Sequence, residues 1–356
     1  MLRLEKLYAV LASAYRAEEY PALRRLREIW ADTRPLAGLR VIVAAPIFRN
    51  TLAQHLAIVA AGAEIVVGIG AGAQYDADIV NLIEEAGIRL ARVDDGNVPD
   101  ADIILDNAGY FAAFSPRIGF AELTRTGAEK YRDCNKPVFL ADAGKIKKIE
   151  TFLGTGESFF RAMAALGHRD WRGKKLVVAG SGKVGSGIIF YAHKFGAEVV
   201  CITDPATLTE KTRQRVSQVV DYRDDAGIIF AVRDAFAVVT ATGKKDALAR
   251  AEVSAALTRS PALLANMGVE DEYGTGVPTE RVLEKKRSLN FFLDDPTHMK
   301  FIEGTLALHA AGAVFLAEHA GSLPRGIFAP PPEIEDAILR ITRERGCISE
   351  ELKSIE

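Results

Sequence analysis

The sequence has little of what marks a secreted, metal-stabilised or membrane-spanning protein. Its three cysteines, Cys134, Cys201 and Cys347, lie far apart without a CxxC spacing, so neither a zinc site nor a redox pair is expected. No stretch reaches about 18 consecutive apolar residues, the length of a membrane-spanning helix, and the charged N-terminus lacks the apolar core of a secretory signal. We therefore expect a cytoplasmic protein with no membrane partner and no metal.

An excess of charge of one sign is also missing. The 45 basic and 47 acidic side chains leave a formal net charge of −2 over 356 residues, whereas proteins that bind nucleic acid usually carry a basic face. Nucleic acid is therefore not expected as a partner. At about 100–200 residues per domain, the length indicates two domains, each large enough to form its own core.

Glycine, in contrast, is plentiful, with 30 residues, and it helps to punctuate an alternation of strands and helices. Strands that alternate with helices of ordinary length indicate a parallel sheet covered by helices. The predicted fold class is therefore α/β, with two Rossmann-like domains and a cleft between them. In the first half the pattern predicts helical segments within 2–31 and at 52–61 and 76–86, and strands at 40–45, 64–69, 89–93 and 103–106.

A second series of elements begins after residue 150. A helix at 157–166 precedes the strand Lys175–Ala179, which runs directly into a glycine-rich loop, a helix at 188–195 and a strand at 196–204. A long apolar helix is expected at 301–319, and a Pro/Gly-rich exit at 321–332 leads to a short terminal helix. Further strands are predicted at 228–231, 237–241 and 262–266.

The glycine-rich loop has the spacing and the context of a dinucleotide-binding motif. Gly180 permits a tight turn after the strand, Gly182 lets the backbone approach a pyrophosphate, and Gly185 allows the following helix to pack on the strand. The N–H groups at the start of that helix bind the diphosphate, and Lys183, next to Val184, adds positive charge. The sequence therefore predicts a bound dinucleotide.

The next strands add candidates for the same site. Asp204 ends the strand that follows the loop and is placed to accept hydrogen bonds from the adenosine ribose, which favours NAD. Thr203 beside it, with Lys211 and Arg213 nearby, keeps NADP open as the less favoured cofactor. Three residues of a later strand end fall at the same edge of the sheet, where they belong to the cofactor site or form a simple turn: Thr240, Thr242 and Gly243.

Several of these segments resemble S-adenosylhomocysteine hydrolases. Glu157-Ser158 before an apolar helix, followed by Gly173-Lys-Lys-Leu-Val-Val-Ala-Gly180-Ser-Gly-Lys-Val-Gly185, is similar to that family's entry into its NAD domain. Other shared segments fall in the family's order, so the resemblance covers roughly residues 38–320. These are Gly62-Ala-Glu-Ile, Ile104-Leu-Asp106 before Gly109, Glu122-Leu-Thr124-Arg-Thr126-Gly127, Thr240-Ala-Thr242-Gly243 and Asn266-Met-Gly268.

The resemblance implies both a domain organisation and a mechanism. The implied domains are a substrate domain, 1–150 plus 294–356, and an inserted NAD-binding Rossmann domain, 151–293. The implied mechanism oxidises a ribose 3′-hydroxyl, so that the 4′-proton becomes acidic and the 5′-thiol leaves, and then reduces the ketone again. Most of the family's acids and bases are nevertheless replaced here, which predicts a different substrate or reaction. Their positions fall near Pro46 and on Asn107, Leu123, Val269 and Asp295.

Four residues are the candidates for catalysis. Lys147 falls, by resemblance, on the family's catalytic lysine, with Glu150 or Thr151 in place of the accompanying aspartate; a solvated lysine is the alternative. His298, before the apolar helix, is either a proton carrier or a solvated histidine at a helix start. Asp106 orients a substrate hydroxyl or forms a turn, and Asn107 can hydrogen-bond a hydroxyl but cannot act as a base.

A second group of residues is linked to the cofactor by resemblance only. Thr124 and Thr126 would contact the nicotinamide side, and Asn290 would do likewise; local capping is the alternative. His55, on a predicted helix, and His168, near a loop, are interpreted as structural or exposed.

Together these residues predict a homo-oligomeric NAD-dependent oxidoreductase that acts on a small molecule, as a dimer or tetramer. Its reaction would be the redox interconversion of a secondary alcohol and a ketone on a nucleoside-like substrate, and not the standard hydrolysis. A 2-hydroxy or 2-oxo acid dehydrogenase, with Arg49 or Arg125 gripping the carboxylate, is a first alternative. A catalytically silent NAD-binding regulatory or partner subunit is the second.

Overall fold

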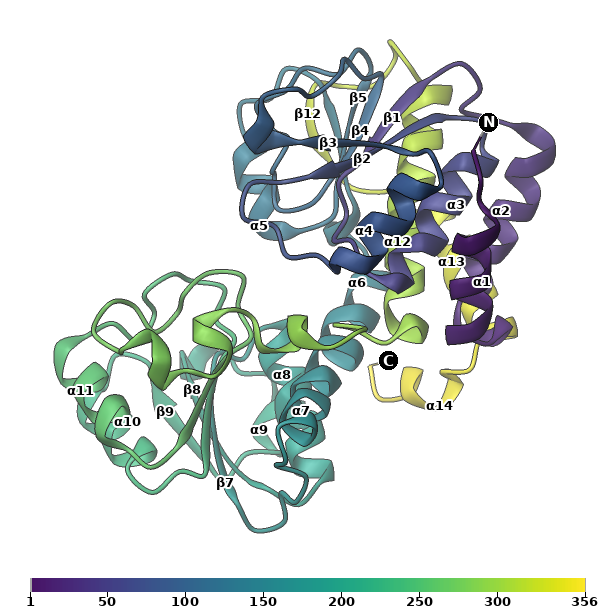
Figure 1. Cartoon of the computed structure of the whole chain (residues 1–356). Helices are drawn as coiled ribbons and strands as arrows, with labels where there is room; N and C mark the ends of the chain where they lie inside the picture. The colour runs from purple at the N-terminus through teal and green to yellow at the C-terminus, as the bar shows by residue number, and fades with distance from the viewer. Residues whose placement is uncertain (1, 356) are drawn as a thin grey trace. The chain divides into compact units, whose positions relative to one another are not determined.

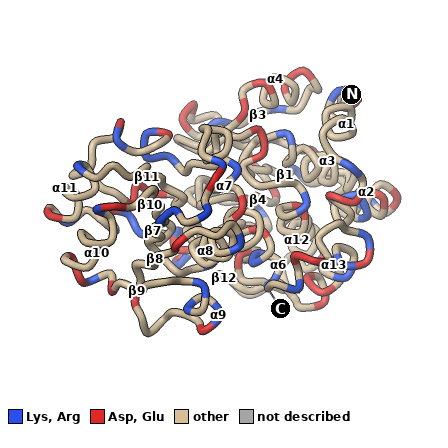
Figure 2. The backbone as a smooth tube through the Cα atoms, turned by 90° about the horizontal axis from the view of Figure 1, so that it is seen from below, with Lys and Arg blue, Asp and Glu red and all other residues tan. Residues whose placement is uncertain are grey.

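The computed structural model describes residues 2–355, which form two compact units. The first unit contains the chain up to Glu150 and again from His298 onward, and the second contains Thr151–Thr297 (Figure 1). Each unit has its own parallel sheet. Basic and acidic residues are interspersed along the backbone of both units (Figure 2).

Seven parallel strands form the sheet of the first unit, in the order β12-β6-β5-β4-β1-β2-β3. The order reverses between β1 and β4, and in open α/β sheets ligands bind at the carboxyl ends of the strands beside such a switch point. The strands are β1 Arg40–Val43, β2 Glu64–Ile69, β3 Arg89–Arg92, β4 Ile103–Asp106, β5 Gly119–Glu122, β6 Pro137–Leu140 and β12 Gly326–Phe328.

Helix α12 (Met299–Glu318) lies at the centre of the first unit, where it packs on β4 and β5 and against several helices. It is the one helix among residues 2–355 long and apolar enough to cross a membrane, but 78% of its apolar window is buried, as is usual for a core helix. The other helices of this unit are α1 Glu5–Ala14, α2 Pro21–Thr33, α3 Leu52–Ala60, α4 Ala77–Glu85, α5 Arg125–Ala128, α6 Ile146–Lys148, α13 Pro332–Arg345 and α14 Ser349–Leu352.

Five parallel strands form the sheet of the second unit, in the order β11-β10-β7-β8-β9, which is the doubly wound order of nucleotide-binding domains. The prediction of two Rossmann-like α/β domains is confirmed. The strands are β7 Lys175–Ala179, β8 Glu198–Thr203, β9 Gln218–Asp221, β10 Ala237–Thr240 and β11 Leu263–Asn266. The helices are α7 Gly156–Ala165, α8 Lys183–Lys194, α9 Glu210–Arg213, α10 Asp225–Val232 and α11 Ala251–Arg259.

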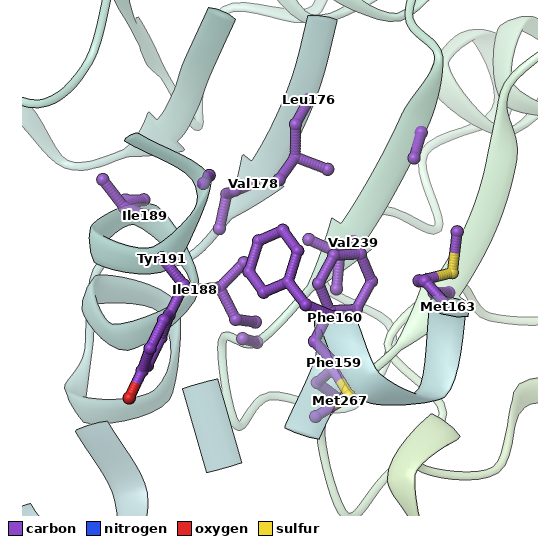
Figure 3. Packing of buried hydrophobic residues seen from close by; sticks show 14 of the residues in the cluster. Phe159, Phe160, Met163, Leu176, Val178, Ile188, Ile189, Tyr191, Val239 and Met267 are labelled. Atoms are coloured by element: carbon purple, nitrogen blue, oxygen red, sulfur yellow. The ribbon is translucent and has the colours of Figure 1, made fainter. Parts of the chain in front are cut away.

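The main core of the second unit lies between this sheet and the helices α7 and α8. Figure 3 shows Phe159 and Phe160 of α7 beside Ile188 of α8 and Val178 of β7. The two helices approach closely because both carry glycine at the contact; a Cβ at Gly156 of α7 would collide with the backbone of Gly187 in α8. Close packing of this kind fixes where α8 begins relative to the sheet.

Four local predictions need correction. The segment 228–231, predicted as a strand, lies in α10, whose first turn is capped by the Asp224 carboxylate accepting the N–H of Gly227 at 3.0 Å. Four apolar residues are too short a run to distinguish a strand from a helix, so the cap decides. The helical pattern within 2–31 is two helices, α1 and α2. The exit at 321–332 contains the short strand β12, and β5, β6 and β9 had not been predicted.

Candidate functional site

The glycine loop of the second unit has the geometry that a dinucleotide requires. Gly180 has a φ of +108°, a conformation that favours glycine. A Cβ at Gly185 would collide with the carbonyl oxygen of Gly180, so the close approach of α8 to the loop also requires glycine. A Cβ at Gly182, in contrast, would meet no atom within 4 Å. The space beside Gly182 is therefore open at the start of α8, where a diphosphate fits.

The start of α8 supplies the polar groups of this loop. Gly182 is the N-cap and offers no side chain to the first amides of the helix, which leaves their N–H groups for an anion. Lys183, the first residue of α8, is exposed, and Val184 packs against the core of the unit. These residues fit the dinucleotide that the sequence predicted, through backbone N–H groups and one lysine.

Asp204 directly follows β8, at the place where a ribose-binding acid is expected. Its Oδ1 accepts the N–H of Ala206 at 3.0 Å and lies 3.6 Å from Nη2 of Arg223, a residue that the sequence did not single out. Thr203, the last residue of β8, pairs its hydroxyl with that of Ser181 in the glycine loop at 2.7 Å. The end of β8, where the ribose is expected, thus combines one acid, two hydroxyls and one arginine. These residues are Asp204, Ser181, Thr203 and Arg223.

The turn after β10 is held by a buried acid. Glu272 accepts the N–H of Gly243 at 2.7 Å, and both the N–H and the hydroxyl of Thr242 at 2.8 Å. Burial raises the pKa of Glu272, and these hydrogen bonds oppose the rise. Thr240 is buried and donates its hydroxyl to Oδ1 of Asn266 at 3.0 Å. The polar groups of Thr240, Thr242 and Gly243 therefore hydrogen-bond to Asn266 and Glu272, and these bonds fix the turn at the edge of the sheet.

In the first unit, two buried carboxylates face each other at the carboxyl ends of neighbouring strands. Asp106 of β4 and Glu122 of β5 are partners in the strand register, and both are fully buried. Asp106 accepts the N–H of Asn107 at 2.8 Å, the N–H of Phe111 at 2.9 Å and the hydroxyl of Tyr131 at 2.5 Å. Its oxygens are thus occupied by the loop that follows β4 and by Tyr131, which follows β5.

Glu122 holds the same loop from the other side. It accepts the N–H of Ala108 and of Gly109, each at 3.0 Å, and the N–H and hydroxyl of Thr124 at 2.7 and 2.6 Å. Ala108 has a φ of +56°, a strained conformation that these bonds maintain. Burial, and then the charge of Glu122, raise the pKa of Asp106 to about 7, and burial also raises that of Glu122. The pair therefore retains a proton near neutral pH.

Lys147 lies in α6, after β6, and is not a solvated lysine. Its side chain is only 5% exposed, and its Nζ lies 2.9 Å from both carboxylate oxygens of Glu150, itself 13% exposed. The structure thus brings together Lys147 and Glu150, one of the two residues, with Thr151, predicted to accompany it. A buried ammonium held by a carboxylate is able to donate hydrogen bonds and to exchange a proton.

His309 of α12 is a second ionisable group near this lysine. Its Nε2 lies 2.9 Å from the carbonyl oxygen of Ala121, so Nε2 carries the hydrogen, and Nδ1 accepts the amide N–H of Gln54 at 3.1 Å. Burial, together with the charge of Lys147, lowers the pKa of His309 to about 4. The neutral imidazole therefore links α12, α3 and the end of β5 next to Glu122.

The remaining predicted residues have varied surroundings. His298 is half-buried at the N-cap of α12, and Asn107 is half-buried directly after Asp106. The hydroxyl of Thr124 donates to Glu122 and accepts the N–H groups of Ala108 and Gly127, so it caps α5, while Thr126 is exposed. Asn290 is buried and donates to the carbonyl oxygen of Pro296 at 3.0 Å. The contacts of Thr124 and Asn290 are therefore local.

Two further residues bear on the alternative functions. Arg49, a proposed carboxylate grip, donates from Nε to the hydroxyl of Tyr15 at 3.2 Å and stacks on its ring. His55 is fully buried in α3, which agrees with the structural role, one of the two predicted for it, and not with an exposed position, and burial lowers its pKa to about 4. Among residues 2–355, no group of three or more His, Cys, Asp or Glu is arranged to hold a metal ion.

Sequence reasoning missed four residues that organise these sites: Glu122, His309, Glu272 and Arg223. Two of them had a detectable signal. An acid that ends a buried strand, as Glu122 does, and a single histidine within a 20-residue apolar helix, as His309 is, are both polar exceptions in apolar surroundings. Glu272 and Arg223 lie in loops after strand ends, where sequence alone does not reveal which group they contact.

Comparison with known proteins supports the resemblance found in the sequence. The chain is 25% identical to the adenosylhomocysteinase of Archaeoglobus fulgidus, over 92% of both chains. It is 24% identical to that of Thermococcus kodakarensis, over 90% of this chain and 87% of that protein. It is 23% identical to the S-inosyl-L-homocysteine hydrolase of Methanopyrus kandleri, over 92% of this chain and 88% of that protein.

Other comparisons are weaker. No protein-family model matches the chain. A dipicolinate synthase subunit from Bacillus halodurans, a solved structure, is 12% identical with a TM-score of 0.47, covering 78% of this chain and 98% of that one. The similarity to the curated hydrolases extends over nine-tenths of the sequence and includes both units. The chain is therefore an adenosylhomocysteinase-like protein.

Proposed function

We propose that this chain is a cytoplasmic, homo-oligomeric NAD-dependent enzyme that interconverts a secondary alcohol and a ketone on a nucleoside-like substrate, without the hydrolytic steps of its relatives. One observation carries the proposal: a glycine loop with open space at Gly182 occurs together with a buried Lys147–Glu150 pair, whereas several acids and bases of the hydrolases are replaced. When bound, a nicotinamide dinucleotide accepts or returns a hydride.

The proton of the alcohol must go to a group of the chain. Lys147 is the first candidate, because its buried ammonium donates a hydrogen bond to a substrate oxygen and, once deprotonated, accepts the hydroxyl proton. Glu150, at 2.9 Å, orients it and balances its charge. His298 is the second candidate, since imidazole exchanges protons near neutral pH. Asn107 is proposed to hydrogen-bond a neighbouring hydroxyl.

The proposed loss of hydrolysis rests on the residues that replace acids and bases of the hydrolases in the first unit. Elimination of a 5′-thiol requires a base that removes the 4′-proton and an acid that protonates the leaving sulfur. Asn107 cannot act as either, and Leu123 is apolar. The nearest carboxylates, Asp106 and Glu122, direct their oxygens to backbone N–H groups and hydroxyls of their own loop. They are positioning residues for Asn107 and Thr124.

Two measurements on the purified full-length chain test the proposal. Absorbance and mass spectrometry should detect copurified nicotinamide dinucleotide, and no binding of NAD or NADP at millimolar concentration would sink the cofactor assignment. A panel of nucleosides, with hydroxy acids as comparison, is then assayed for NADH formation. Turnover of a nucleoside without release of homocysteine from S-adenosylhomocysteine supports the proposal, and release of homocysteine contradicts it.

Variants of the two proton carriers distinguish an enzyme from a silent subunit. Lys147→Gln should abolish turnover while cofactor binding is retained, because the glycine loop lies in the other unit. His298→Gln tests the second carrier, and Lys148→Gln, next to Lys147 but bonded to the carbonyl oxygen of Ile355 at 2.8 Å, is the matched control. Undetectable turnover of the native chain on every substrate, with cofactor bound, favours a regulatory or partner subunit.

A further inference from the structure

An arginine lies beside the ribose-binding acid in the second unit. Arg223 follows β9, and Asp221, the last residue of that strand, holds its guanidinium through two bonds of 2.8 Å, Nε to Oδ1 and Nη2 to Oδ2. The register of the sheet pairs Asp221 with Thr203, the residue before Asp204. The guanidinium therefore has a fixed orientation, with Nη2 at 3.6 Å from Oδ1 of Asp204.

Two hydroxyl groups lie at the end of β8, next to Asp204. Ser181, within the glycine loop, and Thr203, at the end of β8, place their oxygens 2.7 Å apart. The N–H of Tyr222, the residue before Arg223, donates to the carbonyl oxygen of Thr203 at 3.0 Å, which brings Arg223 to this corner. Because one hydrogen bond between two hydroxyls uses only one of their two hydrogens, the other is able to donate to a ligand.

Folding stability does not account for the arginine. The side chains of Arg223 and Asp204 are 59% and 35% exposed, and an ion pair so exposed contributes little to stability. The same exposure leaves the guanidinium accessible to a ligand at the ribose end of the site. A second cation lies at the same loop, since Arg213 donates to the carbonyl oxygen of Pro205 at 3.2 Å.

We propose that this corner binds the 2′-phosphate of NADP, so that the site accepts NADP as well as NAD. The inference rests on the proposed function, because it concerns the cofactor of the same site. An arginine near the end of the second strand is the usual partner of the 2′-phosphate, and its planar fork matches phosphate oxygens. Asp204 and Asp221 by themselves would repel the phosphate, but Arg223 contacts both carboxylates, Arg213 adds a second positive charge at the same loop, and the N–H of Ala206 holds Oδ1 of Asp204.

Calorimetric titration of the full-length chain with NAD and with NADP tests this inference. NADP should bind within about tenfold of NAD, and its affinity should fall more steeply with added salt, because it carries the extra phosphate charge. Arg223→Ala should weaken NADP by about 10- to 100-fold, as expected for the loss of a charged hydrogen bond, and NAD by less than about threefold. Arg223→Lys, which keeps the charge but not the fork, should fall between the two.

Two further variants sharpen the comparison. Asp204→Asn should weaken NAD and leave NADP unchanged or tighter, because NAD relies on the carboxylate to hold its 2′-hydroxyl. Arg259→Ala removes one exposed positive charge from α11, away from this corner, and should change neither affinity. Thermal unfolding of each variant establishes that it is folded.

The outcomes separate this inference from the proposed function. If neither dinucleotide binds, both fail. If NAD binds but NADP binds more than about 100-fold more weakly, or if Arg223→Ala weakens both dinucleotides equally, the inference is overturned and the proposed function stands. Selective loss of NADP in Arg223→Ala, together with selective loss of NAD in Asp204→Asn, supports it.

Discussion

Replacing Asp106 by asparagine should change how the stability of the first unit depends on pH. Burial and the neighbouring charge of Glu122 raise the pKa of Asp106 from its ordinary 3.8 to about 7. Between these two values the unfolded chain has released the proton that the folded chain keeps. Folded stability therefore falls as the pH rises through this window, because ionising the buried group costs free energy only in the folded state.

The structure sets the size of the effect. A rise in pKa from 3.8 to about 7 corresponds to about 4 kcal/mol, and between pH 5 and pH 7 it should appear as about 1.4 kcal/mol per pH unit. In Asp106→Asn the oxygen replaces Oδ2, which accepts the N–H of Phe111 and the hydroxyl of Tyr131. The amide NH₂ then faces the N–H of Asn107, which costs about 1–2 kcal/mol at every pH.

The variant should therefore be about as stable as the native chain near pH 5, less stable below it, and about 2 kcal/mol more stable at pH 7. Urea unfolding, followed by tryptophan fluorescence at several pH values, measures this crossover. The chain has two tryptophans. In a Trp171→Phe background, Trp30, which is buried in α2, reports on the first unit alone.

The difference between variant and parent isolates Asp106 from the other groups that titrate in this range. Asp76→Asn is the matched control, because Asp76 is an N-cap that accepts the N–H of Asp78 at 2.9 Å, and asparagine caps a helix equally well. A constant free-energy difference between Asp106→Asn and its parent from pH 5 to pH 7 would refute the reasoning. A pH-dependent difference in Asp76→Asn would show that the slope belongs to some other group.

Three further predictions follow from the packing of the two sites. Gly182→Ala should leave the melting temperature nearly unchanged and weaken NAD at least tenfold in a titration, whereas Gly185→Ala should also destabilise the fold, because only the second Cβ meets backbone. Lys147→Met should lower the unfolding free energy by about 3–5 kcal/mol, because it removes the ammonium that lies 2.9 Å from the buried Glu150 carboxylate, and adding Glu150→Gln should recover part of the loss in urea unfolding. His309, whose pKa burial lowers to about 4, should contribute stability above about pH 6.5 that is lost as the pH falls toward 4, and His309→Gln should remove that part of the acid sensitivity.

The glycine loop and four of the five strands of the second unit could be predicted from the sequence. Its glycine loop combines local rules, a strand followed by a tight turn and a helix, and the structure has Gly180 and Gly185 at the positions where a side chain would collide. The sequence did not predict contacts between residues that are far apart in the chain. Arg223 lies beside Asp204 because β8 and β9 are neighbours in the sheet, and the pairing of those strands was not predicted.

The first unit resisted prediction for a related reason. Asp106 and Lys147 were found by resemblance, but the ionisable groups near them come from other elements. Glu122 of β5 raises the pKa of Asp106, and His309 of α12, 162 residues after Lys147, has its own pKa lowered in part by the charge of Lys147. The strands β5 and β6 were also missed. Without those strands, the sequence could not show that Glu122 lies opposite Asp106.

The two sites also differ in what a substitution can reveal about function. In the second unit the proposed cofactor contacts are backbone N–H groups, open space at Gly182 and exposed side chains such as Arg223, so a substitution at Gly182 or Arg223 should change binding with little change in stability. In the first unit the candidate groups are buried and partnered, so a substitution such as Lys147→Met acts on stability first. A loss of turnover in the first unit therefore identifies a catalytic role only when cofactor binding and folding are shown to be intact in the same variant. The cofactor assignment can be tested without a loss of folding stability. The search for a substrate should therefore start from it.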